Sequence, residues 1–378
     1  MPPRTNPDWL YGFQTGADWF LACGSGLQQV TANLHKPHAQ FPSTVLLIGK
    51  HESEAARQAL LPGYSHSRSR GIAQVQADGS TSNNEHPLLV ASLGIDNACS
   101  LQKPPQKDAG SSRHKVRWLS EQSTASETES FVETIVGRLL LLFVDVVCIF
   151  LDDFASCEEG VQFLQRFAHY GSLSQGWKPQ VILVSSGIYT RKVSLDPSIF
   201  GRIRPILLPI NNRKILPSSR FSTLKKTILS SMEMVRKSRS SSKMLYSAYH
   251  LNLFFESALC HVAKCVSTPF NFVLATRQCN RIEDHLWLYL RNFLGLCAAN
   301  HVSKEATLEY MASAIMLDSF PPGMHRKRST QKLSCFDSNQ QALNRRRSST
   351  HYTNLTALKP FLRCLLNKGS LRQLHVCS

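Results

Sequence analysis

The sequence predicts an α/β domain built on a parallel sheet, followed by a helical domain and a disordered basic tail. Two apolar segments rich in β-branched residues, Val146–Leu151 and Val181–Val184, flank a segment with helical spacing at Glu158–Tyr170. Continuous apolar strands on either side of one helix are typical of a parallel sheet that is covered on both faces. Later in the chain, apolar patterns predict long helices at Met244–Val266 and His285–Ala299.

Weaker patterns predict the remaining elements of the α/β domain. The apolar run Thr44–Ile48 predicts a strand, and a helix is expected over Glu52–Leu60 after Gly49. Gly71–Asp78 alternates between apolar and polar residues, and Pro87–Ser92 is a short apolar run, so both are predicted strands. The last patterns are a helix leading into a strand at Glu129–Leu142, a strand at Ile206–Leu208, an amphipathic helix at Phe221–Val235, a Ser-rich basic link at Ser238–Lys243 and a helix at Ala306–Leu317.

Composition divides the 378 residues into segments, and the 42% hydrophobic content is enough for a core. Scattered aromatic side chains near the N-terminus are expected to pack as a cover on this core. The predicted segments are an N-terminal segment (1–42), the α/β domain (43–210) with a disordered insertion (95–128), a basic helix and linker (211–243), the helical domain (244–323) and a basic low-complexity tail (324–378).

Residues Ser43–Ala59 have the strand, loop and helix pattern that opens a nucleotide-binding P-loop domain, but the residues that hold phosphate are absent. A phosphate-binding loop follows the pattern Gly-x-x-x-x-Gly-Lys-Ser/Thr, which supplies the turn, the charge and the Mg²⁺ ligand. Counted from Gly49, the last three positions are Glu54, Ala55 and Ala56. We therefore expect a degenerate P-loop-like domain that has lost the phosphate chemistry.

If nucleotide binding is retained, its residues are expected at the ends of the predicted strands. Lys50 is a substitute for the missing lysine, and the acids after Val146–Leu151 lie where P-loop proteins hold Mg²⁺ and where ligands of open α/β sheets collect. The alternative, which we favour, is that these acids only end a strand and that Ser185-Ser186-Gly187 forms a turn. The candidate nucleotide-binding residues are Gly49, Lys50, Asp152, Ser185 and Ser186.

The sequence predicts no catalytic residue, no metal site and no cofactor. The segment closest to a serine-hydrolase Gly-x-Ser-x-Gly motif, Ser172–Gly176, lacks the first glycine and follows a helix instead of a strand. His261 and Cys265 share a helix face, but two ligands without a third are weak evidence for metal, so core packing is expected. Eleven cysteines without a Cys-x-x-Cys pair indicate a reducing intracellular setting, cytoplasmic or nuclear.

The formal net charge of +17 is concentrated in the tail, because residues 321–378 hold eleven Lys and Arg against Asp337. Such basic clusters bind nucleic acid, acidic lipid or nuclear import receptors, although a solvated tail is the default expectation. The longest apolar run, Leu139–Leu151, has 13 residues and contains Asp145, so no transmembrane segment is expected. The candidate basic patch consists of Arg326, Lys327, Arg328, Arg345, Arg346 and Arg347.

Four stretches carry a resemblance to a known family: FVDVVCIFLDDFASCEEGVQFL, KPQVILVSSG, LYSAYHLNLFFESAL and ASAIMLDSFPPGMH. Through them, residues from about 43 to 325 resemble the N-terminal half of large fungal patatin-like phospholipase proteins and their stand-alone relatives. In that family this half resembles a P-loop-type α/β domain with a helical segment, ahead of a lipid acyl hydrolase domain. The resemblance implies a regulatory or nucleotide-sensing module, and no residue here matches the hydrolase serine or its oxyanion glycines.

The resemblance ends after His325, where the composition becomes basic and rich in Ser and Asn. Two explanations fit this change: a truncated or misread gene product, and a divergent native tail. The function predicted from the sequence is a non-catalytic regulatory or interaction module with an unidentified protein partner. The alternatives are a residual nucleotide-binding NTPase and a nucleic-acid or acidic-membrane binder that acts through the tail.

Overall fold

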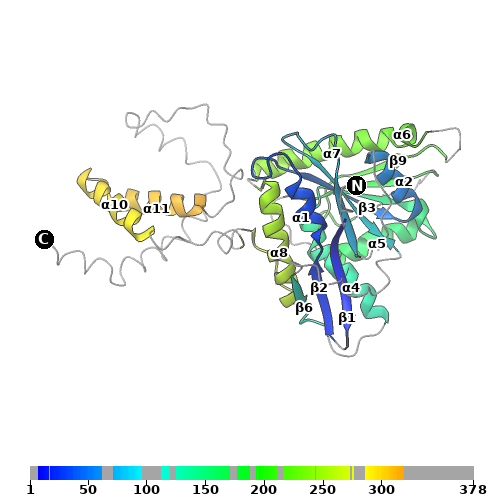
Figure 1. The fold of residues 1–378 in the computed structure, drawn as a ribbon, viewed down its shortest axis with the longest axis horizontal. Helices are drawn as coiled ribbons and strands as arrows, with labels where there is room; N and C mark the ends of the chain where they lie inside the picture. The colour runs from blue at the N-terminus through cyan, green and yellow to red at the C-terminus, as the bar shows by residue number, and fades with distance from the viewer. Residues whose placement is uncertain are drawn as a thin grey trace. The chain divides into compact units, whose positions relative to one another are not determined.

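The computed structural model describes residues 7–16, 18–61, 71–95, 112–119, 125–170, 177–187, 193, 195–210, 216–242, 244–272, 275 and 286–318. The described residues up to 272 belong to one compact unit, and residues 275 and 286–318 belong to a second (Figure 1). The basic patch formed by Arg326–Arg328 and Arg345–Arg347 lies outside the described residues.

A mixed sheet forms the centre of the first unit, and its nine described strands have the order β6-β2-β1-β4-β5-β3-β7-β8-β9. The strands are β1 (Asp8–Thr15), β2 (Asp18–Cys23), β3 (Ser43–Gly49), β4 (Ala73–Ala77), β5 (Leu88–Gly94), β6 (Arg113–Lys115), β7 (Val146–Phe150), β8 (Gln180–Ser185) and β9 (Ile203–Leu207). The predicted α/β class is thereby confirmed.

The sheet is parallel in only one half, so the prediction of a parallel sheet is correct for that half and wrong for the other. Strands β5, β3, β7, β8 and β9 pair with one another in parallel. The other pairings, which join β6, β2, β1, β4 and β5, are antiparallel. The antiparallel half comes mainly from the N-terminal segment, whose aromatic side chains were expected to cover the core. Trp9, Tyr11 and Phe13 are instead buried positions of β1.

Part of the predicted disordered insertion is also ordered. Arg113–Lys115 forms the edge strand β6, which pairs with β2. Just beyond this strand, the indole N–H of Trp118 donates to the carbonyl oxygen of Val262 at 2.8 Å. These contacts join distant parts of the chain, so the local Ser- and Lys-rich composition did not reveal them.

Helices occur at all the positions where the sequence predicted them, with shifted ends. The helices of the first unit are α1 (Ser25–Ala32), α2 (His51–Leu60), α4 (Ala125–Arg138), α5 (Cys157–Tyr170), α6 (Pro217–Arg220), α7 (Ser222–Ser241) and α8 (Ala248–Lys264), and those of the second unit are α10 (Leu286–Ala299) and α11 (Lys304–Asp318). Within the described residues, no helix combines the length and apolar character needed to cross a bilayer.

Helix α7 continues through most of the segment predicted as a Ser-rich link, which corrects that prediction. It ends at Ser241, so Ser238–Ser241 are helical. The physical reason is Arg239, which is buried at 2% exposure and bonds to Asp145. A buried partner for this arginine fixes the last turn of the helix against the sheet.

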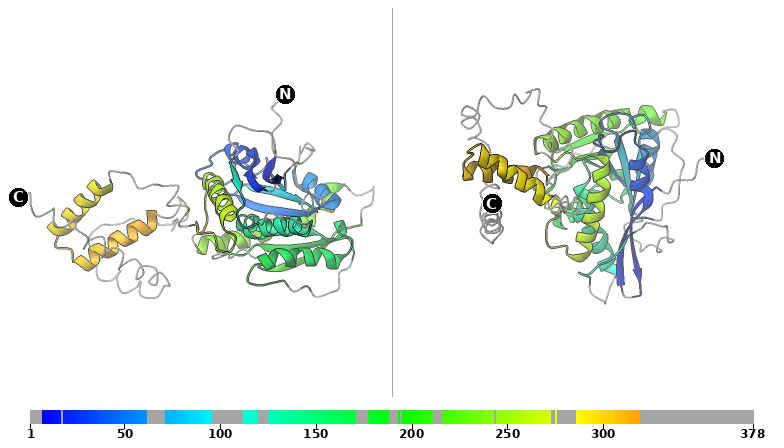
Figure 2. Two further views of the ribbon diagram at one scale, coloured as in Figure 1. Left: turned by 90° about the horizontal axis from the view of Figure 1, so that it is seen from below. Right: turned by 60° about the vertical axis from the view of Figure 1, so that its left-hand side comes forward.

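The helices cover both faces of the parallel half of the sheet (Figure 2). On one face, apolar side chains of α2 and α7 pack against β3, β7 and β8 in a single buried cluster that includes Ala56, Leu60, Leu224 and Ile228. In the sheet, β5 lies on one side of β3, and β7 and β8 lie on the other side. The chain therefore passes from β3 to β5 and then crosses back over β3 to reach β7 and β8. Because crossovers between parallel strands are right-handed, α4 and α5 belong on the face opposite α2.

Candidate functional site

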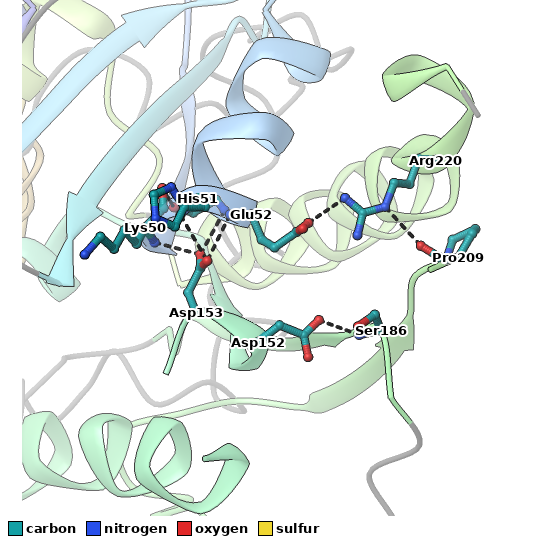
Figure 3. A network of polar contacts seen from close by, with 9 residues as sticks. Lys50, His51, Glu52, Asp152, Asp153, Ser186, Pro209 and Arg220 are labelled. Atoms are coloured by element: carbon teal, nitrogen blue, oxygen red, sulfur yellow. Dashed lines mark hydrogen bonds and ion pairs between the residues drawn. The ribbon is translucent and has the colours of Figure 1, made fainter. Parts of the chain in front are cut away.

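The parallel strands bring the predicted site residues to one edge of the sheet. Gly49 is the last residue of β3, and Ser185 is the last residue of β8. Asp152 and Asp153 follow β7 in the short 3-10 turn η2 (Leu151–Asp153). Figure 3 shows the polar contacts that connect these strand ends. This carboxyl edge is where ligands of open α/β sheets bind.

The carboxylate of Asp153 binds the backbone at the N-terminus of α2. Its Oδ2 accepts hydrogen bonds from the amides of Lys50 at 2.6 Å and Ser53 at 3.1 Å. Its Oδ1 accepts from the amides of His51 at 3.0 Å and Glu52 at 2.9 Å. The first amides of a helix have no partner within the helix and lie at the positive end of its dipole, so they attract an anion. Here that anion is part of the chain itself.

The loop between β3 and α2 is shorter than a phosphate-binding loop. Lys50 is the single residue between the end of β3 at Gly49 and the start of α2 at His51. The positions counted as the motif's Gly, Lys and Ser/Thr, residues 54–56, therefore lie inside the helix. A P-loop wraps phosphate with the residues between its two glycines. This chain lacks the loop as well as the Gly, Lys and Ser/Thr residues of the motif. The sequence alone showed only that the residues were missing.

Gly49 has a structural role at this site. A Cβ atom added at Gly49 would lie 2.3 Å from Oδ2 of Asp153 and 2.8 Å from Cβ of Ser53. The glycine is thus required by the close approach of the Asp153 carboxylate and of the first turn of α2. From the sequence, Gly49 was a candidate nucleotide-binding residue only if nucleotide binding is retained.

Gly49→Ala is expected to lower the free energy of unfolding by about 1–2 kcal/mol, since overpacking a tight contact forces its neighbours to move. Urea denaturation measures this loss. Gly79→Ala is the matched control, because a Cβ atom at Gly79 would meet no atom within 4 Å. Equal losses in the two variants would show that the carboxylate does not occupy the space beside Gly49.

Asp152 and the predicted Ser185–Gly187 segment contact each other. The Oδ2 atom of Asp152 accepts a hydrogen bond from the amide of Ser186 at 2.6 Å. The hydroxyl of Ser185 donates to the carbonyl oxygen of Gly187 at 2.8 Å. These bonds hold the end of β8 beside η2 and form a local turn.

Arg220 joins the end of β9 to the first turn of α2, and sequence reasoning missed this contact. Its Nη1 lies 2.6 Å from Oε2 of Glu52, and its Nε donates to the carbonyl oxygen of Pro209 at 3.0 Å. The guanidinium is buried, at 5% side-chain exposure, and lies over the ring of Phe221. The residues are far apart in the chain and follow no local motif, so no sequence signal connected them.

The electrostatic character of the edge opposes a phosphate ligand. Besides Asp153 and Asp152, Glu52 and Glu54 belong to the first turn of α2. The buried Arg57 on the same helix is paired with Glu54 at 2.6 Å and also donates to other side chains. In Figure 3 the side chain of Lys50 extends away from the Asp153 carboxylate. Glu52 and Glu54 thus occupy the two arginines beside α2, Arg220 and Arg57, and Asp153 occupies the amides that a phosphate would need.

The described residues contain no cluster of three or more His, Cys, Asp or Glu side chains that could hold a metal ion. His261 lies in the last turn of α8, whereas Cys265 follows the helix in an extended conformation, so the predicted shared helix face is not formed, and both residues have other neighbours. Nε2 of His261 lies 3.0 Å from the carbonyl oxygen of Thr268, and Sγ of Cys265 lies 3.2 Å from the hydroxyl oxygen of Ser267. Hydrogen bonds from Ser267 and Thr268 lower the pKa of the Cys265 thiol to about 6.

Comparison with known families and curated proteins found no relative of this chain. No known family matches the chain, and no curated protein shows significant similarity to it. The function is therefore inferred from the geometry of the site.

Proposed function

We propose that this chain is a non-catalytic regulatory or interaction module with a degenerate P-loop-like fold, in which its own carboxylate takes the place of a nucleotide phosphate. The observation that carries this proposal is the set of four amide hydrogen bonds to Asp153. The parallel strands around β3, followed directly by α2, support the P-loop-like part of the proposal. The resemblance to the N-terminal half of fungal patatin-like phospholipases, which implies a regulatory or nucleotide-sensing module, supports the regulatory role.

A nucleotide would have to displace Asp153 before its phosphates reached the amides of α2. Hydrogen bonds to a charged group contribute roughly 1.5–3 kcal/mol each, so the phosphates would have to replace all four bonds before binding gained any stability. The displaced carboxylate would then remain near the incoming phosphate. Two like charges 4 Å apart at a protein surface repel by about 4 kcal/mol. Both terms oppose binding at this edge.

We expect Mg²⁺-ATP and Mg²⁺-GTP at millimolar concentration to leave the melting temperature of the full chain unchanged. A ligand that binds only the folded state stabilises it, by about 2.7 kcal/mol at a concentration of roughly 100 Kd, and so raises the melting temperature. Differential scanning fluorimetry measures the shift, and a phosphate-release assay run in parallel measures hydrolysis. A nucleotide-dependent shift, or hydrolysis that Asp152→Ala abolishes, would support the residual NTPase alternative instead.

A further inference from the structure

A shallow, open groove of about 620 Å³ lies between the edge of the sheet and helix α7 in the first unit. Its lining includes Arg202, Arg204 and Leu207 from β9 and its approach, and Thr223 and Thr227 from α7. Strand β9 is the last described strand on this side of the sheet. The groove thus runs along a strand that has a neighbour on one side only among the described strands.

The outer edge of β9 offers backbone groups to a partner. The carbonyl oxygen of Arg202 and the amide of Leu208 both bond to β8. Because backbone groups alternate along a strand, Ile203, Pro205 and Leu207 direct theirs outward. Pro205 has no N–H, which shortens the stretch that can pair with a second strand. The outward N–H groups of Ile203 and Leu207 remain as two donors, one on each side of this proline.

The charged side chains that line the groove are two arginines, Arg202 and Arg204. The Nε atom of Arg204 is buried and has no hydrogen-bond partner among the described residues. Its Nη1 makes a long contact of 3.4 Å with the hydroxyl oxygen of Ser230, and its Nη2 lies 3.3 Å from the sulfur of Met234. Arg202 is exposed. An occupant that brings carboxylates would therefore meet charges of opposite sign.

An exposed apolar side chain lines the groove. Leu207 of β9 is 57% exposed, and Ile210, in the loop that follows β9, is 76% exposed. Exposed aliphatic side chains beside unpaired backbone groups are features of surfaces that bind an extended peptide.

We propose that this groove binds an extended acidic segment of a protein partner, which places carboxylates on Arg202 and Arg204 and hydrogen-bonds to the outer edge of β9 at Ile203 and Leu207. A second copy of this chain does not fit the charge, because the chain carries a net charge of +17. The residues lining the groove include no aromatic side chain on which bases could stack. The inference rests on the proposed interaction role and names the chemistry of the partner.

Fluorescence anisotropy with a labelled peptide of alternating Glu and Val residues tests this surface in the full chain. Arg202→Glu is expected to weaken binding about tenfold, since truncating or reversing a charge at an interface of opposite charge removes a favourable pair. Arg204→Gln, which keeps most of the apolar stem, is expected to weaken it as well. Arg291→Glu on α10 changes the charge equally at another exposed position and is expected to change affinity less than about twofold.

Two further probes separate this binding from general attraction to anions. A peptide that is N-methylated at the residues facing β9 loses the N–H groups that would donate to the outward carbonyl oxygens of Ile203, Pro205 and Leu207, and it is expected to bind more weakly than the parent peptide. Equal weakening by Arg202→Glu and Arg291→Glu, or equally Arg202-dependent binding of phosphatidylserine vesicles or single-stranded DNA, would overturn the proposal. The experiment uses no nucleotide, so a nucleotide-induced rise in melting temperature would refute the proposed function while leaving the groove unaffected.

Discussion

Replacing Arg239 with Met is expected to lower the free energy of unfolding by about 3–5 kcal/mol, because it leaves the buried carboxylate of Asp145 without its counter-charge. The two side chains are 3% and 2% exposed, and Nη1 of Arg239 lies 2.8 Å from Oδ1 of Asp145. The other carboxylate oxygen accepts a hydrogen bond from the amide of Thr44 at 2.8 Å. The pair therefore connects the end of α7 to the starts of β7 and β3.

Aromatic rings enclose the guanidinium of Arg239. Its central carbon lies 4.4 Å from the ring centroid of Tyr246 and 4.9 Å from that of Trp177. Burial alone would lower the pKa of Arg239, but the nearby Asp145 and Tyr246 outweigh this effect and raise it. Burial also raises the pKa of the Tyr246 hydroxyl to about 12. Arg239 thus stays charged in the core, and the stability of the folded protein depends on its pairing with the Asp145 carboxylate.

Urea denaturation of Arg239→Met measures the predicted loss, and Asp145→Asn is expected to lose a similar amount because it leaves the arginine charge unpaired. Arg236→Met is the matched control, since Arg236 pairs with Glu233 on the same helix and both are partly exposed. Surface pairs of this kind contribute about 0–1 kcal/mol. If Arg236→Met and Arg239→Met lost equal stability, the buried pair would not have the role assigned to it.

Asp153→Ala is expected to lower the free energy of unfolding by about 2–3 kcal/mol, since the amides at the start of α2 lose a charged acceptor. Asp153→Asn keeps one oxygen acceptor without the charge, so its expected loss is about half as large. Chemical denaturation gives both values. Amide hydrogen exchange at Lys50–Ser53 is also expected to accelerate in Asp153→Ala, because these N–H groups would no longer be bonded.

Asp152→Ala provides the control for this prediction. Asp152 is exposed and accepts one hydrogen bond, from the amide of Ser186. Its removal is expected to cost less than about 1 kcal/mol and to leave exchange at residues 50–53 unchanged. A loss of stability in Asp152→Ala as large as that in Asp153→Ala would show that the α2 amides do not depend on Asp153.

Local patterns were sufficient to predict the parallel half of the sheet. The run Thr44–Ile48 became the buried strand β3, and Val146–Leu151 and Val181–Val184 became β7 and β8. These strands are buried on both faces, so they read as continuous apolar segments. The N-terminal strands β1 and β2 carry aromatic side chains in an irregular order, and their pairing with β4 and β6 depends on distant segments. No local pattern contained that information.

The site was predictable in its location but not in its contacts. The sequence placed Gly49, Asp152 and Ser185 at the ends of strands, which the structure shows. It also indicated that phosphate ligands were missing. The hydrogen bond from Lys50 to Asp153 joins residues 103 positions apart, and the bond from Arg239 to Asp145 spans 94. Which carboxylate meets which donor is decided by the packing of α2 and α7 on the sheet.

The central claim is that the chain's own Asp153 carboxylate occupies the place of a nucleotide phosphate. Crystals of the full chain soaked in a nonhydrolysable nucleoside triphosphate with Mg²⁺ test it most directly. We expect the Asp153 carboxylate to remain on the amides of Lys50–Ser53, with no phosphate density above them. Triphosphate density seated on these amides, with Asp153 displaced, would contradict the claim.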